Sequence, residues 1–285
     1  MSIFSAATVP ARLKDNPLAQ GSLWLTWSPS FRRLIGRLRQ AGALRQRVSI
    51  TRVPSCKPYD KTYTISYGKL APELRQEIEQ FLPSLKTQPC GKKAVFFRRM
   101  LSPTLNSNEI RAVFALLRVA FIQQEGNPAA SLYSPVSPEK NDPGFNLHAD
   151  LYLPTKLWLI FDDVPDDGSG ASLFLTRKQL LRSMQSVPGV PKKAHQEVAQ
   201  LLDLPLAKDS YNKMYDLIYD RRKTWCQRLQ AAMSRGMQSV CLFRGEGYLI
   251  DDRNWLHGRS PVSQAVTERR FHRLTFDMDR DYSAQ

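Results

Sequence analysis

Three side chains able to hold a metal ion form the clearest chemical pattern in this sequence. His148 and Asp150 are separated by one residue, and His257 follows Asp150 by 107 residues. Two imidazoles and one carboxylate can hold Fe(II) on one face of an octahedron, leaving three positions open for chemistry. Because the chain contains only four histidines, the pattern is more informative here than in a histidine-rich protein. It predicts that His148, Asp150 and His257 bind Fe(II) and form the catalytic centre.

The residues around the first two ligands alternate between apolar and polar types, which is typical of a β-strand. Over residues 147–153, leucines and an alanine alternate with His148, Asp150 and Tyr152. A strand places His148 and Asp150 on one face about 7 Å apart, whereas residues i and i+2 of a helix diverge. The third ligand must then come from a distant strand. Asn146 and Tyr152, which flank the pair, are candidate substrate contacts. The alternative is a strand-end histidine beside an unrelated surface acid.

Two further segments resemble those of iron(II)/2-oxoglutarate-dependent oxygenases. Residues 247–259, with the sequence Gly-Tyr-Leu-Ile-Asp-Asp-Arg-Asn-Trp-Leu-His-Gly-Arg, resemble the distal-histidine segment of the branch containing taurine dioxygenase and clavaminate synthase. Asp252 stands where those sequences commonly have Asn, which bears on local hydrogen bonding. Residues 168–174, Gly-Ser-Gly-Ala-Ser-Leu-Phe, resemble a glycine-rich turn that ends in a hydroxyl residue. In the resembled family this hydroxyl helps to hold the cosubstrate 2-oxoglutarate, which implies that role for Ser172.

Arginines follow the distal histidine at a spacing similar to that of the same branch. There, one arginine grips the distal carboxylate of 2-oxoglutarate and a second lies four residues later, which implies Arg269 and Arg273. A guanidinium matches a carboxylate with two parallel hydrogen bonds. Arg269 is therefore expected to anchor the cosubstrate, while Arg273 holds an anionic group of the substrate or is itself the cosubstrate ligand. The alternative is a pair of surface arginines on an edge strand.

Two other residues near the distal histidine have open roles. Arg259 either orients a substrate or pins its own loop. His272 lies on the opposite face of the predicted strand from Arg269, and we expect it to be structural or substrate-facing.

The resemblance implies an α+β fold with a double-stranded β-helix (jelly-roll) core, flanking helices and a helical insert. Residues 1–30 have no regular pattern. Helical spacing starts at Phe31 and recurs at Pro72–Leu82, at 108–124 and through 177–236, where Tyr211–Met233 is the longest candidate. Strands are predicted at Val95–Leu101, Leu147–Leu153, Leu157–Phe161, Ser172–Leu175, Ser239–Phe243, Tyr248–Ile250 and Arg269–Phe276.

Most of these strands flank the helical block, so we expect residues 1–285 to form a single oxygenase domain. Within it, residues 1–90 are a basic region of unclear role, and 177–236 are an insert between the ligand-bearing segments. Residues 133–144, rich in Pro and Ser, are either a lid over the site or a plain surface loop.

The resemblance also implies the reaction. Fe(II), 2-oxoglutarate and O2 would be used to hydroxylate, desaturate or cyclise a small polar metabolite, an amino acid or a carrier-tethered intermediate, with release of succinate and CO2. Asp150 argues against halogenation, because related halogenases lack this carboxylate. The additional arginines Arg259 and Arg273 suggest an anionic group on the substrate.

Composition and charge limit the classes of function that this chain could have. The hydrophobic content of 42% is ordinary for a globular protein, and no run of about 18 apolar residues predicts a membrane span. The absence of a secretory pattern and of paired cysteines predicts a cytoplasmic protein. The net charge is +15, and residues 1–52 carry nine basic side chains against one acidic one.

This charge permits a different class of function, a non-catalytic basic barrel that binds nucleic acid or an acidic partner such as a carrier protein. It is not favoured, because the basic–aromatic alternation of single-strand binders is missing. A cupin-like dioxygenase or isomerase that keeps the metal without the cosubstrate is a further alternative. Arg269 and the turn at 168–172 argue against it.

Overall fold

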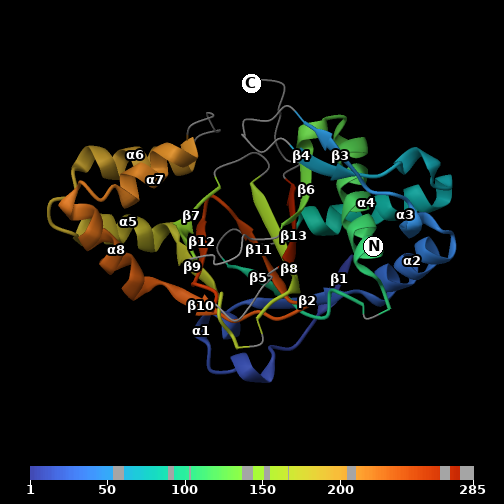
Figure 1. The fold of residues 1–285 in the computed structure, drawn as a ribbon, viewed down its shortest axis with the longest axis horizontal. Helices are drawn as coiled ribbons and strands as arrows, with labels where there is room; N and C mark the ends of the chain where they lie inside the picture. Colours follow the sequence, from blue (N-terminus) through green and yellow to red (C-terminus); the bar gives the residue numbers. More distant parts are fainter. Residues whose placement is uncertain are drawn as a thin grey trace.

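The computed structural model describes residues 1–53, 61–88, 93–102, 104–136, 144–150, 155–165, 167–203, 210–263 and 270–276. These residues form a mixed α/β structure with two large sheets and eight α-helices. Helices cover the outer side of each sheet, so the molecule is layered as helices, sheet, sheet and helices (Figure 1). The predicted mixture of helices and large sheets is confirmed.

The larger sheet has seven strands, and only the β2–β5 pair is parallel. Its inner strand β8 is the longest at eight residues and has five consecutive buried ones, as expected for a strand covered on both faces. In spatial order the strands are β1 (Phe4–Ala6), β2 (Leu23–Trp27), β5 (Val95–Phe97), β11 (Gly247–Asp251), β8 (Lys156–Asp163), β13 (Arg270–Phe276) and β6 (Ser131–Val136).

The smaller sheet is antiparallel throughout and carries both predicted histidine ligands. Its strands lie in the order β10 (Gln238–Val240), β9 (Ser172–Thr176), β12 (Trp255–Arg259) and β7 (Phe145–His148). A separate hairpin is formed by β3 (Ser49–Arg52) and β4 (Lys61–Thr64).

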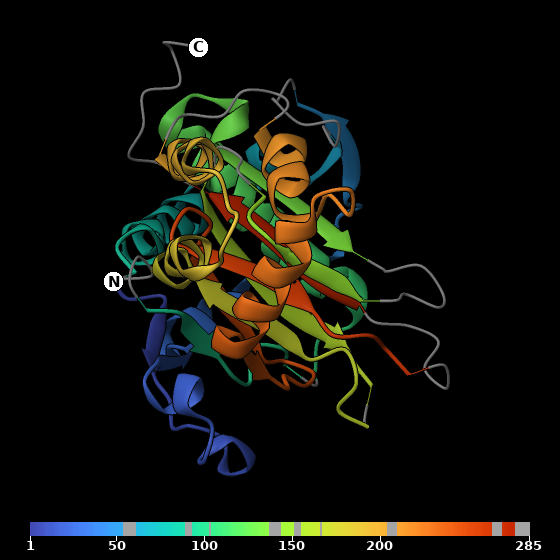
Figure 2. The same cartoon turned by 90° about the vertical axis from the view of Figure 1, so that its left-hand side faces the viewer.

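Each outer layer consists of amphipathic helices, and side chains cap the first turns of α4 and α5. The oxygen of Asn106 accepts from Glu109 N at the start of α4, and that of Thr176 accepts from Gln179 N at the start of α5. The helices beside the larger sheet are α2 (Pro29–Gln40), α3 (Pro72–Lys86) and α4 (Ser107–Glu125). Those beside the smaller sheet are α5 (Arg177–Ser186), α6 (Lys192–Asp203), α7 (Ser210–Tyr219) and α8 (Thr224–Gly236) (Figure 2). The short helices are α1 (Pro17–Gln20), η1 (Ala11–Leu13), η2 (Ala43–Arg45), η3 (Tyr67–Lys69) and η4 (Pro128–Ala130).

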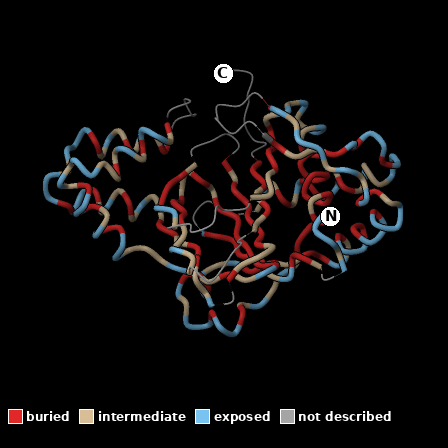
Figure 3. Tube along the Cα trace, in the orientation of Figure 1, coloured by how far each residue is buried: buried red, intermediate tan, exposed pale blue. Residues whose placement is uncertain are grey.

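Three apolar cores separate these layers, and buried residues concentrate in the sheets (Figure 3). Trp158 and Phe114 belong to the core between the larger sheet and its helices. Phe161 and Phe174 belong to the core that joins the two sheets. Leu256 belongs to the core under α5–α8. Along each strand, side chains therefore alternate between an inter-sheet face and a helix-covered face.

The helix predictions are confirmed except for the longest. The expected helix Tyr211–Met233 is two helices, because α7 ends at Tyr219 and α8 begins at Thr224. Between them Asp220 forms a turn in which its carboxylate accepts from Arg222 N at 3.0 Å. An aspartate that bonds its own neighbouring backbone competes with the helical hydrogen bonds.

Several strand predictions were wrong in extent or missing. Residues 1–30 are not irregular, because β1 and β2 pair with each other and extend the larger sheet beyond β5. Residues 133–136, expected to begin a lid, belong to β6, and 137–143 lie outside the described residues. The bounds of β12 were not predicted, although His257 was expected on a distant strand and does lie on β12. Its five residues are nearly all buried, so they show no polar–apolar alternation.

Candidate metal site between the two sheets

His148, Asp150 and His257 meet at one end of the smaller sheet. One possible ligand atom from each lies within 4.8 Å of the other two. Strands β7 and β12 are antiparallel neighbours in which His148 and His257 are directly paired, so both rings lie on the same face. The ring centroids are 4.3 Å apart. The histidine side chains are each 10% exposed, which leaves them shielded but reachable.

The ring of His148 is oriented by its own strand. Its Nδ1 lies 2.8 Å from the carbonyl oxygen of Asn146. A carbonyl can only accept, so this contact requires the proton on Nδ1 and leaves the lone pair of Nε2 for a metal. That Nε2 lies 3.6 Å from Asp150 Oδ1, so the two atoms are close enough to bind the same ion.

Asp150 is not part of the strand on which the sequence pattern placed it. β7 ends at His148, and residues 151–154 lie outside the described part of the chain. The amide of Asp150 donates to Asp252 Oδ1 at 3.0 Å, a side-chain acceptor from the turn before β12. The chain has therefore left the β-ladder at the second ligand, and the expected alternation from 147 to 153 is wrong at this point.

Gly258 is required by the close approach of β7 to β12. The pairing slips between His257 and Arg259, so that β7 carries one extra residue. A Cβ at Gly258 would lie 2.6 Å from the carbonyl oxygen of Phe145 and 3.1 Å from Leu147 N. The glycine of the His-Gly-Arg segment thus allows the two ligand strands to pack together.

Helix α7 supports β7 through three tyrosines spaced one turn apart. The hydroxyl of Tyr219 donates to Leu147 O at 2.7 Å, and that of Tyr215 accepts from Asn146 Nδ2 at 2.8 Å. The ring of Tyr211 meets that of His148 edge-on, with centroids 5.7 Å apart. The helical insert therefore contacts three successive residues of the strand that carries the first ligand. The sequence pattern did not single out these tyrosines, although their i, i+4, i+8 spacing is visible in it.

Ser172, expected to hold the cosubstrate, is 2% exposed and pairs directly with Arg259 across β9 and β12. Arg259 lies two residues after His257, so all three share the inter-sheet face. Burial lowers the pKa of the Arg259 guanidinium, although it remains a cation at neutral pH. A hydroxyl and a guanidinium on the ligand face are suitable partners for a carboxylate.

The two arginines expected on β13 have different positions. Arg269 lies outside the described residues. Arg273 pairs with Leu159 and lies on the same face as Phe271, whose ring packs in the core between the sheets. Arg273 is thus on the inter-sheet face of the larger sheet. The pairing slips between Arg270 and Phe271, so the predicted strict alternation begins only at Phe271. Tyr152 also lies outside the described residues.

His272 lies on the helix-covered face of β13. Its Nδ1 is 2.8 Å from the hydroxyl of Tyr133, and its ring stacks on Phe114 with centroids 4.9 Å apart. Burial, together with the positive charges of Arg111 and Arg270, lowers its pKa to about 3. The ring is therefore neutral at neutral pH, and the sheet separates it from the inter-sheet face.

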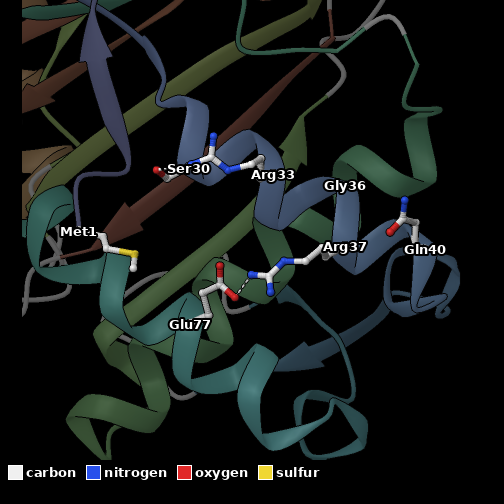
Figure 4. A pocket seen from close by; sticks show the side chains of 7 residues that line it. All are labelled: Met1, Ser30, Arg33, Gly36, Arg37, Gln40 and Glu77. Atoms are coloured by element: carbon white, nitrogen blue, oxygen red, sulfur yellow. Dashed lines mark hydrogen bonds and ion pairs between the residues drawn. The ribbon is translucent and has the colours of Figure 1, made fainter.

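A groove on α2 holds part of the N-terminal positive charge, away from the candidate metal site. Figure 4 shows it lined by Arg33 and Arg37 of α2 together with Glu77 of α3. Arg37 is ion-paired with Glu77, and Arg39 with Glu109 at 3.0 Å. Internal acidic partners thus neutralise some of the basic residues in this region.

No family model and no curated protein matches the chain. Solved structures with a similar course of the chain include asparagine oxygenase in complex with Fe(II), 2S,3S-3-hydroxyasparagine and succinate. That comparison has 14% identity and a TM-score of 0.44, and covers 90% of this chain and 93% of the other. The non-heme iron oxygenase OrfP in complex with Fe, succinate and (3S)-hydroxy-L-Arg has 16% identity, a TM-score of 0.46 and coverage of 90% and 94%. OrfP in complex with Fe and L-homoarginine has 15% identity, a TM-score of 0.44 and coverage of 89% and 93%. Likeness at this level assigns no activity to this chain.

Proposed function

We propose that this chain is a non-haem Fe(II)/2-oxoglutarate-dependent oxygenase. The observation that carries the proposal is the convergence of two imidazoles and one carboxylate, with one ligand atom from each within 4.8 Å of the others. This donor set suits Fe(II) and leaves coordination positions open, unlike the closed sites that hold structural zinc. With its cosubstrate bound, the iron supplies oxidation by O2, with release of succinate and CO2.

The side chains around the triad have supporting roles in this proposal. His148, Asp150 and His257 hold the ion. Ser172 and an arginine hold the far carboxylate of 2-oxoglutarate, and Arg269 and Arg273 are the candidates for that arginine. Arg273 is on the inter-sheet face, and Arg269 lies outside the described residues. Arg259 lies on the facing sheet and would hold an anionic group of the substrate.

Aromatic residues restrict access of water to the ligand face. Phe174 pairs with His257 across β9 and β12, and the Tyr248 ring of the larger sheet lies 6.5 Å from that of His257. Excluding water strengthens the ionic contacts that orient a bound carboxylate. Asn146 is a less direct candidate for substrate contact, since its side chain bonds Tyr215.

The same proposal extends to the fold and the substrate class. The two facing sheets are interpreted as a double-stranded β-helix in a single domain of residues 1–285, with 177–236 as a helical insert. The substrate is a small polar metabolite, an amino acid or a carrier-tethered intermediate that is hydroxylated, desaturated or cyclised, in a cytoplasmic setting. Within the described residues, no helix is long and apolar enough to cross a membrane.

The test is succinate formation from 2-oxoglutarate by purified protein supplied with Fe(II) and O2. Wild type is expected to release succinate even without the true substrate, since 2-oxoglutarate turnover proceeds slowly when uncoupled. His148→Ala removes one of three ligands and is expected to reduce the rate to that of metal-free protein. Equal rates in the two proteins would remove the triad from the mechanism.

His195→Ala is the matched control, because His195 lies on α6 and is not part of the triad. It is expected to keep the wild-type rate. A wild type that binds Fe(II) without consuming 2-oxoglutarate would instead support the cupin-like alternative. A protein that binds no Fe(II) but binds DNA or RNA with steep salt dependence would support the basic binding protein.

A further inference from the structure

Asp252 is a buried carboxylate that lies behind two of the three candidate ligands. Its Oδ1 accepts from Asp150 N at 3.0 Å and lies 3.7 Å from His257 Nδ1. The residue is 2% exposed, and its own amide donates at 2.9 Å to the carbonyl oxygen of Thr155, the residue that precedes β8. One oxygen atom is thus placed between the backbone of one ligand and the ring of another.

The neighbouring Asp251 has a different task. Its carboxylate accepts from Arg253 N at 3.0 Å and from Asn254 Nδ2 at 3.1 Å, which shapes the turn between β11 and β12. Neither contact involves a ligand of the triad. Of these two adjacent aspartates, Asp251 therefore shapes the turn and Asp252 faces the candidate ligands.

We propose that Asp252 is a positioning residue that sets the tautomer of His257 and the placement of Asp150. This inference rests on the proposed function. A carboxylate beside Nδ1 favours the proton on that nitrogen and so directs Nε2 toward the metal, while increasing the ring's donor strength. The same oxygen holds the amide of Asp150 where that residue has left the β-ladder.

Charge balance gives a second reason for a carboxylate here. Burying an anion is costly unless opposite charge lies near it. A divalent cation held by two neutral imidazoles and the single anion of Asp150 retains one net positive charge, which Asp252 compensates. Asparagine at this position would keep an acceptor oxygen for Asp150 N but would remove the negative charge.

The test is Co(II) affinity, measured by titration of the visible absorption of the ion in wild type and variants. Outer carboxylates that orient ligating histidines typically change metal affinity by about 10- to 100-fold. We expect Asp252→Asn to weaken Co(II) binding about 10-fold and Asp252→Ala to weaken it further. Asp251→Asn is the matched control and is expected to lower thermal stability while changing Co(II) affinity by less than about twofold.

A measurement on the wild type keeps the inference testable if the Asp252 variants do not fold. In the Zn(II)-loaded, nitrogen-15-labelled protein, His257 is expected to carry its proton on Nδ1 and to bind the ion through Nε2. The opposite tautomer would overturn the inference, as would wild-type Co(II) affinity in Asp252→Asn. A wild type that binds neither Co(II) nor Zn(II) would overturn the proposed function itself, which distinguishes the two failures.

Discussion

The two candidate histidine ligands are oriented by different kinds of partner. His148 faces a carbonyl of its own strand, whereas His257 faces the carboxylate of Asp252 from the preceding turn. A carbonyl fixes the tautomer of the ring without adding a net charge, whereas a carboxylate fixes the tautomer and also adds a negative charge. The two imidazoles are therefore expected to differ in donor strength although they are adjacent.

Gly258→Ala tests whether close strand packing holds the ligands together. The added Cβ would meet backbone atoms of β7 at 2.6 to 3.1 Å, and these atoms can move only if the strands separate. We expect a loss of about 1–3 kcal/mol in the free energy of unfolding, as for overpacked cores, together with weaker Co(II) binding.

The control for that variant is Gly36→Ala. Gly36 lies within α2, and nothing lies within 4 Å of the position that its Cβ would occupy. Alanine there is expected to be neutral or to raise stability by about 0.5–1 kcal/mol. Urea unfolding measures both variants, and a Gly258→Ala protein as stable as the wild type would refute the packing argument.

The sequence identifies the three candidate ligands but not the contacts that position them. Residue type and spacing indicate His148, Asp150 and His257, and the structure brings them together. Whether they bind iron stays a prediction. The departure of Asp150 from its strand depends on Asp252, about 100 residues later, and no local alternation can reveal such a contact.

Helix α7 links the helical layer to the ligand strand, and Tyr219→Phe tests that link. The Tyr219 hydroxyl bonds a backbone carbonyl adjacent to His148, and burial raises its pKa well above the ordinary value, so it stays a donor at every physiological pH. Removing this hydrogen bond is expected to cost about 1 kcal/mol in the free energy of unfolding.

Tyr215→Phe is the matched comparison, since it removes a hydroxyl of the same helix that makes a solvent-exposed contact with Asn146. Its expected cost is smaller, because water can replace the lost partner. Urea unfolding would contradict the proposed link if the two variants lost equal stability.

Among the elements, helices were easier to predict than strands. The stripe of α4 and its Asn106 cap are local signals, and the observed helix begins and ends within one residue of the predicted 108–124. β12 and β2 lack such signals, because a short strand buried on both faces is defined by its partners. The break between α7 and α8 depends on hydrogen bonds of Asp220, which apolar periodicity does not report.

Over the whole molecule, the buried His272 predicts how stability depends on pH. Its pKa is lowered from 6.5 to about 3 in the folded protein, first by burial and then by nearby arginines. The unfolded chain therefore binds a proton at a higher pH than the folded one. Stability from this residue is complete above about pH 6.5 and is lost as the pH falls toward 3, by up to about 1.4 kcal/mol per pH unit.

His272→Asn keeps a polar atom near Tyr133 but removes the titrating ring. Urea unfolding between pH 6.5 and 4 is expected to show a shallower dependence of stability on pH in the variant than in the wild type. If the free energy of unfolding fell equally with pH in the two proteins, His272 would not contribute to the pH dependence of stability.

The sequence predicts a mixed α/β fold but not the structural role of residues 1–90. This region supplies β1 and β2 to the larger sheet and α2 and α3 to its outer layer. The parallel pairing of β2 with β5 joins segments far apart in the chain, so local patterns could not predict it. The basic residues of α2 are the exposed face of a helix whose apolar stripe is buried in the core.

The four helices beside the smaller sheet leave and rejoin it on paired strands. The chain passes from β9 into α5 at Arg177 and returns from α8 into β10, and Phe174 of β9 is paired with Gln238 of β10. Adjacent strands are about 4.8 Å apart, so the block is attached as though it were the tip of a hairpin. This block of helices can therefore be lengthened or exchanged without changing the register of either sheet, provided that the tyrosines of α7 that contact β7 are retained.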